Sequence, residues 1–177
     1  MRFTVLFLLS FLCLCAFGQR NGGYYVTHAG DTAYCDIRAY SNLRGKMELS
    51  DFSRSITVEG DGGSKKLKPR DIRAFVFVDV DTTYKFVTLP GDESRFFHEV
   101  VKGNLSFYKL YVPGNTLPVM VKGDKVIYLN VIGTKKRIAE LIEDCQGLLS
   151  EWEVGERYTV RDREEIVRAY NACGGLK

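Results

Sequence analysis

The chain is poor in the residues from which metal and acid–base sites are most often assembled. It contains two histidines, His28 and His98, and one tryptophan, Trp152. The histidines show no HxH or HxxxH spacing, whereas a zinc site needs three or four ligands at fixed geometry. We therefore expect no metal site and no cofactor, and we place both histidines at surface or edge-strand positions.

Motifs of nucleophilic and nucleotide chemistry are missing as well. There is no GxSxG, the turn that carries the nucleophile of many serine hydrolases. The glycine- and lysine-rich segment 60–66 lacks the spacing of a phosphate loop, and Pro69 stops a helix where such a loop requires one. Asp79-Val80-Asp81 has the DxD spacing of some metal-dependent glycosyltransferases, but aspartate is an ordinary turn former. We interpret both segments as turns or loops of hairpins.

Charge of one sign is not in excess. The sequence has 25 basic and 22 acidic residues, a balance that gives no long-range field for nucleic acid. Its most basic stretch is a candidate site for an anionic partner such as a polysaccharide or a lipid head group, and comprises Lys65, Lys66, Lys68, Arg70 and Arg73. A solvated strand edge would have the same composition.

The longest apolar run lies at the N-terminus. Arg2 precedes the run 3–15, which is apolar except for Thr4 and Ser10, and Ala16-Phe17-Gly18 follows. This is the pattern of a cleavable signal peptide over residues 1–18. The run is shorter than the roughly 20 residues of a membrane span. We predict cleavage between Gly18 and Gln19, no transmembrane span in the mature chain, and an exported protein that is periplasmic, outer-membrane-associated or secreted.

Three cysteines remain after this cleavage: Cys35, Cys145 and Cys173. An oxidising compartment permits a disulfide, and Cys145 and Cys173 lie on the apolar faces of two predicted helices. A strict antiparallel helix pair would offset the two residues by about 10 Å, beyond the ~7 Å that a disulfide spans between Cα atoms. The link 151–159 could absorb this offset. The alternatives are a Cys145–Cys173 disulfide or two buried thiols, and Cys35 is predicted to be a small core residue of a strand.

Residues 24–130 have the pattern of β-strands, with β-branched and aromatic residues in short runs between glycine turns. The fully apolar segment 74–78 predicts a central strand covered on both faces, with 84–89 as its antiparallel neighbour. Glycine-led type II′ turns at Gly103-Asn104 and Gly123-Asp124 predict two further hairpins. A first hairpin is expected over 26–38, and strands with one solvated face are expected at Met47-Leu49 and Ile56-Val58.

After Gly133 the apolar period changes to that of a helix, over 134–150 and again from about Thr159. The fold class predicted is α+β: a mainly antiparallel β-sheet, either a sandwich or a partly open barrel, followed by two C-terminal α-helices. We assign 19–132 to the β-rich part and 133–177 to a helical pair packed on the same domain.

Several segments resemble small exported proteins of Bacteroidetes-type bacteria. They are Ala16-Phe17-Gly18-Gln19, residues 68–75, residues 101–108, Asp144-Cys145 and Tyr170-Asn171-Ala172-Cys173. The resemblance implies a bacterial envelope setting and supports the pairing of Cys145 with Cys173. Its motifs are patterns of fold, so it implies no activity.

The expected function is therefore that of an exported, non-catalytic binding or structural module of the bacterial cell envelope, with an envelope protein or a polysaccharide as partner. Six tyrosines are candidates either for a recognition surface or for the core: Tyr24, Tyr25, Tyr34, Tyr40, Tyr108 and Tyr111. One alternative is a carrier of a small apolar ligand in a β-barrel, although the GxW motif of lipocalins is missing. Another is a hydrolase whose site is assembled from residues distant in sequence.

Overall fold

The structure, a computed structural model, describes residues 19–39, 47–60, 62–129, 132–155 and 157–173. The predicted signal peptide, residues 1–18, lies outside the described residues, so only Gln19 of the predicted cleavage site Gly18-Gln19 is described. The strands are β1 (Gln19–Thr27), β2 (Thr32–Ala39), β3 (Ile56–Gly60), β4 (Gly63–Leu67), β5 (Ile72–Asp79), β6 (Thr82–Leu89), β7 (Asp92–Val101), β8 (Leu105–Val112), β9 (Asn115–Lys122) and β10 (Lys125–Tyr128).

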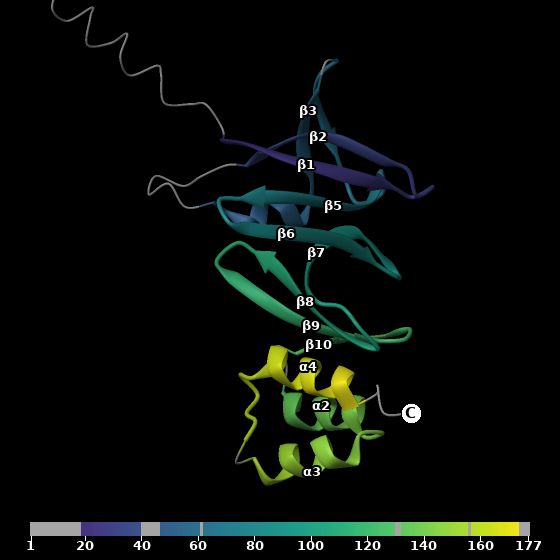
Figure 1. Ribbon diagram of the computed structural model, residues 1–177, viewed down its shortest axis with the longest axis vertical. Coiled ribbons are helices and arrows are strands. Elements are labelled where there is room, and N and C mark those ends of the chain that lie inside the picture. Colours follow the sequence, from purple (N-terminus) through teal and green to yellow (C-terminus); the bar gives the residue numbers. More distant parts are fainter. Residues whose placement is uncertain (1–18, 40–46, 61, 130–131, 156, 174–177) are drawn as a thin grey trace, which may run out of the picture.

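These ten strands form one antiparallel sheet in the order β10-β9-β8-β7-β6-β5-β1-β2-β3-β4. Figure 1 shows the succession from β10 beside the helices to β1 and β2 at the other end. Two runs of sequential hairpins, β1 to β4 and β5 to β10, are joined where β1 pairs with β5. The sheet is not closed, because β10 and β4 lie at opposite ends of this order. The prediction of an α+β fold with a mainly antiparallel sheet is confirmed, as is the pairing of β5 with β6.

One face of the sheet holds a core of phenylalanines. Phe75 and Phe77 of β5 stack with Phe86 of β6 at ring-centroid distances of 4.9 and 6.3 Å, and none of the three rings is exposed. Phe52 packs on this cluster, 4.8 Å from Phe77. It is carried by η2 (Leu49–Ser53), a short 3₁₀-helix. The strand predicted at Met47-Leu49 is therefore wrong at Leu49, because the tighter helical turn lets Phe52 enter the core.

A second apolar cluster lies on the other face of β6 to β10 and includes Leu89, Phe97, Tyr108, Leu110 and Val119. The neighbours Phe96 and Phe97 of β7 are both fully buried, but in different clusters. The strand has an irregular register between Glu99 and Val101, and such bulges bend a strand and increase its twist. Each face of β7 is therefore covered by a separate group of side chains.

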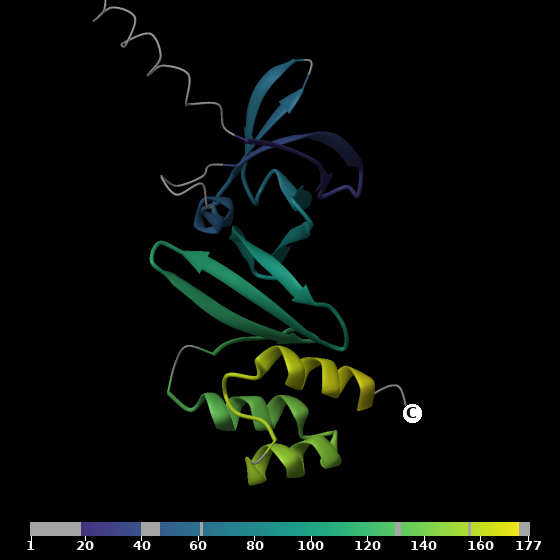
Figure 2. The same cartoon turned by 60° about the vertical axis from the view of Figure 1, so that its left-hand side comes forward.

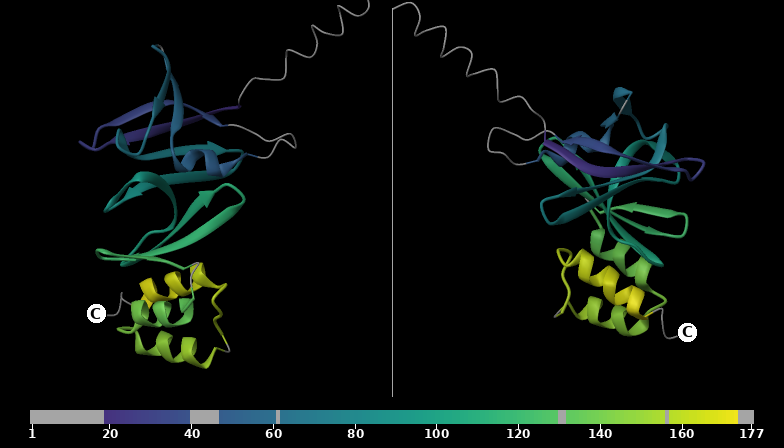
Figure 3. Two further views of the ribbon diagram at one scale, coloured as in Figure 1. Left: turned by 180° about the vertical axis from the view of Figure 1, so that it is seen from behind. Right: turned by 45° about the horizontal axis from the view of Figure 1, so that its top comes forward.

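The helices are α2 (Thr134–Ile142), α3 (Gln146–Val154) and α4 (Arg163–Cys173). They gather at one end of the molecule beside β8 to β10, with α3 farthest from the sheet (Figures 2 and 3). Their apolar side chains share one cluster with Leu105, Phe107 and Met120 of the sheet. The described C-terminal residues form three helices where two were predicted, because the segment expected as one helix over 134–150 is broken at Glu143-Asp144-Cys145.

Two hydrogen bonds and a disulfide hold this break in place. Asp144 accepts hydrogen bonds from Lys122 Nζ of β9 at 2.8 Å and from the Tyr170 hydroxyl of α4 at 2.8 Å. Cys145 leaves the helical backbone region, with φ −112° and ψ 79°, and forms a disulfide with Cys173. The break removes the offset expected for two continuous helices, and the two Cα atoms lie 6.3 Å apart. The predicted pairing is thus present.

The two glycine-led turns differ from each other. Gly123 has a φ of 56°, in keeping with the positive φ that a type II′ turn requires at its first central position, whereas Gly103 has no positive φ. The type II′ prediction is therefore wrong for Gly103. A Cβ atom at Gly103 would collide with the side-chain amide of Asn171 in α4. Glycine is needed there for close packing against a helix.

Among the described residues, no helix is both long enough and apolar enough to cross a membrane.

Candidate binding groove

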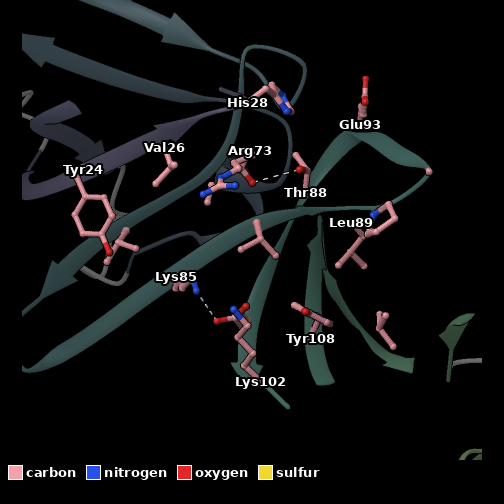
Figure 4. A pocket seen from close by; sticks show the side chains of 17 residues that line it. Tyr24, Val26, His28, Arg73, Lys85, Thr88, Leu89, Glu93, Lys102 and Tyr108 are labelled. Atoms are coloured by element: carbon pink, nitrogen blue, oxygen red, sulfur yellow. Dashed lines mark hydrogen bonds and ion pairs between the residues drawn. The ribbon is translucent and has the colours of Figure 1, made fainter. Parts of the chain in front are cut away.

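A groove of about 690 Å³ lies on the face of the sheet opposite the phenylalanine core. Figure 4 shows the side chains around it. Its apolar lining comes mainly from β1, β5 and β6, and comprises Val26, Ala74, Val76, Val87 and Leu89, with Tyr24 and Tyr108 at its sides. Charged and polar side chains complete the lining, among them His28, Arg73, Lys85, Thr88, Glu93, Glu99 and Lys102.

The floor follows from strand alternation in β5. Phe75 and Phe77 point into the core, so Ala74 and Val76 point to the other face. There Val26 is the cross-strand partner of Ala74 on β1, and Val87 is its partner on β6. Ala74 and Val76 are only 7% and 8% exposed. The prediction of a central strand is confirmed, but its second face is the floor of an open groove.

Three cations enter the groove from neighbouring segments, Arg73 on β5, Lys85 on β6 and Lys102 just after β7 (Figure 4). Lys85 Nζ lies 2.8 Å from Glu99 Oε1, and the Glu99 side chain is only 12% exposed. Within the described part of the chain, Arg73 and Lys102 make no ion pair. The groove therefore offers two cationic groups that are free to meet a ligand.

The tyrosines divide between groove and core. Tyr24 and Tyr34 are cross-strand partners on β1 and β2, with ring centroids 5.8 Å apart, and Tyr34 is 85% exposed. Tyr108 lies deeper, and burial raises its pKa. Tyr25 and Tyr111 pack against the phenylalanine core, and Tyr40 lies outside the described residues. The core position predicted as one alternative is thus found for Tyr25 and Tyr111, whereas Tyr24 and Tyr108 line the groove.

The basic stretch predicted as a binding site does not converge. Lys65 pairs with Val58 and Lys66 with Thr57, so these adjacent residues of the edge strand β4 point to opposite faces. Arg70 lies 3.9 Å from Asp71, and the backbone N–H of Lys68 donates to Asp71 Oδ2 at 2.8 Å. Only Arg73 lines the groove, joined there by Lys85 and Lys102. Cross-strand register brings these three together, and no single stretch of sequence shows it.

The two histidines lie apart and have different hydrogen-bond partners. His28 Nε2 donates to the carbonyl oxygen of Pro69 at 3.0 Å, at the edge of the groove. His98 is half-buried, hydrogen-bonded to the Tyr111 hydroxyl at 3.0 Å and stacked on Phe86. Burial lowers the pKa of His98 to about 4, with a further contribution from Lys109. The surface or edge position expected for His98 is wrong, because β7 is an internal strand and this face packs on the core.

Comparisons with protein-family models, with curated proteins and with solved structures found no match. What the groove can bind is therefore inferred from the residues that line it. No group of three or more metal-ligating side chains is found in the ranges that the structure describes. The groove combines an apolar floor, tyrosine rings at its sides, and the cations Arg73 and Lys102. This combination is suited to holding an extended anionic ligand.

Proposed function

We propose that the chain is an exported, non-catalytic binding module of the bacterial cell envelope and that the groove over β1, β5 and β6 is its binding site. The observation that carries the proposal is the position of the free cations Arg73 and Lys102 beside an apolar floor in an open groove. Binding sites commonly combine apolar contact area with a few oriented polar groups.

The setting of the proposal comes from the N-terminus and the cysteines. Cleavage after Gly18 would leave Gln19, the first residue of β1, so the strand that joins the two halves of the sheet would remain whole. A disulfide between Cys145 and Cys173 is typical of an oxidising compartment. Both observations support an exported protein that is periplasmic, outer-membrane-associated or secreted. The near-neutral charge gives no support to nucleic acid as the partner.

The two alternative functions receive less support from the geometry. A carrier would enclose its ligand, whereas this sheet has two free ends and the groove opens on its face. A hydrolase would need a nucleophile or a water held by a base. The one histidine that lines the groove, His28, is occupied by the Pro69 carbonyl, and Glu99 by Lys85. The geometry thus favours a site that holds a ligand without transforming it.

Export is tested by expressing the full chain in a bacterial host and measuring the mass of the protein in the periplasm and medium. We expect a mature chain that begins at Gln19. A chain that keeps Met1 and stays in the cytoplasm would contradict the proposed setting.

Binding is tested by sedimenting the exported protein with an envelope fraction from a Bacteroidetes-type bacterium. Thr88→Trp places a large side chain in the groove. Because it blocks contacts with the ligand, we expect the bound fraction to fall several-fold. Thr116→Trp adds the same side chain at an exposed position outside the groove and should bind as the wild type does. Equal binding of both variants, or release of soluble fragments from the envelope over time, would count against the proposal.

A further inference from the structure

The strands beneath the groove offer a ligand no free sheet edge. β1, β5, β6, β7 and β8 each pair with a strand on both sides. A peptide that binds by adding a strand needs a free sheet edge. A ligand of this groove must therefore be recognised through side chains on the face of the sheet.

The aromatic side of the groove suits a flat ligand with an apolar face. Tyr24 lines the groove, and Tyr34, which lies just outside the lining, is 85% exposed with its ring beside that of Tyr24. A pyranose ring carries C–H groups on one face and hydroxyls around its rim, so it can stack on a tyrosine while its hydroxyls remain hydrated. The floor beside these rings is made of short side chains, Ala74 and Val76, and offers no deep pocket for a peptide side chain.

The cations fit negative charges at the rim of such rings. Arg73 and Lys102 are free of ion pairs within the described residues, while the charge of Lys85 is offset by Glu99. A guanidinium group binds a carboxylate or a sulfate through two parallel hydrogen bonds. Uronic acids and sulfated sugars present such groups beside the ring face, so stacking and ion pairing can occur together.

The surface available to a ligand extends from the groove to Tyr34. The row of cross-strand partners from Tyr34 on β2, outside the groove lining, through Tyr24 and Val76 to Lys85 crosses four adjacent strands. At about 4.8 Å between strands this row is roughly 15 Å long. A chain of several sugar units fits this length better than a single small molecule.

We infer that the ligand of the groove is an acidic polysaccharide chain, whose sugar rings stack on Tyr24 and Tyr34 while its carboxylate or sulfate groups pair with Arg73 and Lys102. This inference rests on the proposed function and names the chemical class of its ligand.

The test is isothermal titration calorimetry of the exported protein with four probes. Hexagalacturonate carries carboxylates, a heparin hexasaccharide carries sulfates, cellohexaose is neutral, and hexaglutamate is an acidic peptide without sugar rings. We expect one or both acidic oligosaccharides to bind, cellohexaose and hexaglutamate to bind at least about tenfold more weakly, and binding to weaken with salt.

Three variants locate the binding. Arg73→Gln with Lys102→Gln should weaken acidic oligosaccharide binding by about tenfold or more, since two charge-assisted contacts are lost. Tyr34→Ala should weaken it by about fivefold, since the stacking ring is lost. Lys65→Gln with Lys66→Gln removes the same charge from β4. These lysines do not line the groove, so affinity should stay within about twofold, because salt screens exposed charges that do not contact the ligand. Circular dichroism checks that each variant is folded.

Three results would overturn the inference. They are the absence of binding to both acidic oligosaccharides at millimolar concentration, binding of hexaglutamate as tight as theirs and unaffected by Tyr34→Ala, or an equal loss in the β4 control. Groove-dependent binding to the envelope fraction would meanwhile uphold the proposed function. The failure of the ligand class and the failure of the binding site are thus separated.

Discussion

Asn171 of α4 forms two hydrogen bonds with the backbone of Leu105 at the start of β8. Its Oδ1 accepts from the Leu105 N–H at 2.9 Å, and its Nδ2 donates to the Leu105 carbonyl at 2.8 Å. Leu105 is fully buried, and Gly103 leaves the space that the amide occupies. The Asn171 side chain therefore joins α4 to the sheet by bonding the backbone N–H and C=O of the first residue of β8.

Asn171→Ala should lower the free energy of unfolding by about 2 kcal/mol, because it leaves a buried N–H and C=O without partners. Gly103→Ala should cost about as much, since its Cβ collides with the amide. In the double variant the collision is gone, so the two effects should not add. Urea unfolding followed by circular dichroism measures all three. Strictly additive losses would refute the contact.

The disulfide between Cys145 and Cys173 closes a loop with a sequence separation of 28. Replacing both residues by alanine should lower the free energy of unfolding by about 3–4 kcal/mol, mainly because the unfolded chain gains freedom. Dithiothreitol should destabilise the wild type similarly and leave the double variant unchanged. Urea midpoints with and without reductant test this, with Cys35→Ala as the control that keeps the disulfide. An unchanged wild-type midpoint under reduction would be the contrary result.

His98 makes stability depend on pH. Its pKa in the folded protein is about 4, below the ordinary 6.5, first because of burial and then because of Lys109. The unfolded chain therefore binds the proton more readily between these values, so the free energy of unfolding should fall as pH drops from about 6.5 to about 4. The pKa shift corresponds to a loss of at most about 3 kcal/mol in the free energy of unfolding. Solvent screening at the partly exposed ring reduces this loss to about 2 kcal/mol.

Proton NMR of the imidazole ring measures the folded-state pKa directly, and urea unfolding between pH 4 and 7 measures its effect. His98→Gln should flatten that part of the stability profile. An imidazole that titrates near 6.5 in the folded protein would contradict the burial argument.

Val80 occupies a strained turn position between β5 and β6. Its φ is 52°, a left-handed conformation that β-branched residues rarely adopt, and it is 82% exposed. Val80→Gly should raise the free energy of unfolding by about 0.5–1 kcal/mol, because glycine adopts this conformation without the side-chain penalty. Val78→Gly, in the strand two residues earlier, is the control and should destabilise. Thermal unfolding would decide against the prediction if Val80→Gly lowered the midpoint.

Local patterns in the sequence were sufficient to predict the hairpins. β5 and β6, β7 and β8, and β9 and β10 are neighbours in sequence, and a turn between two apolar runs brings them together. The class of fold followed from the same kind of information, whereas the Cys145–Cys173 disulfide remained one of two alternatives until the helix break was seen. The uninterrupted apolar run 74–78 also implied that β5 has two apolar faces.

Only the tertiary structure decided which strands far apart in the sequence pair with each other. The insertion of β1 between β2 and β5 places Tyr24 beside Val76, and the register from β5 to β7 brings Arg73, Lys85 and Lys102 to one groove. The helix break at Asp144 likewise depends on Lys122 and Tyr170, which contact it from other elements. Such contacts are set by packing energies between segments far apart in the chain, and these leave no periodic trace in either segment alone.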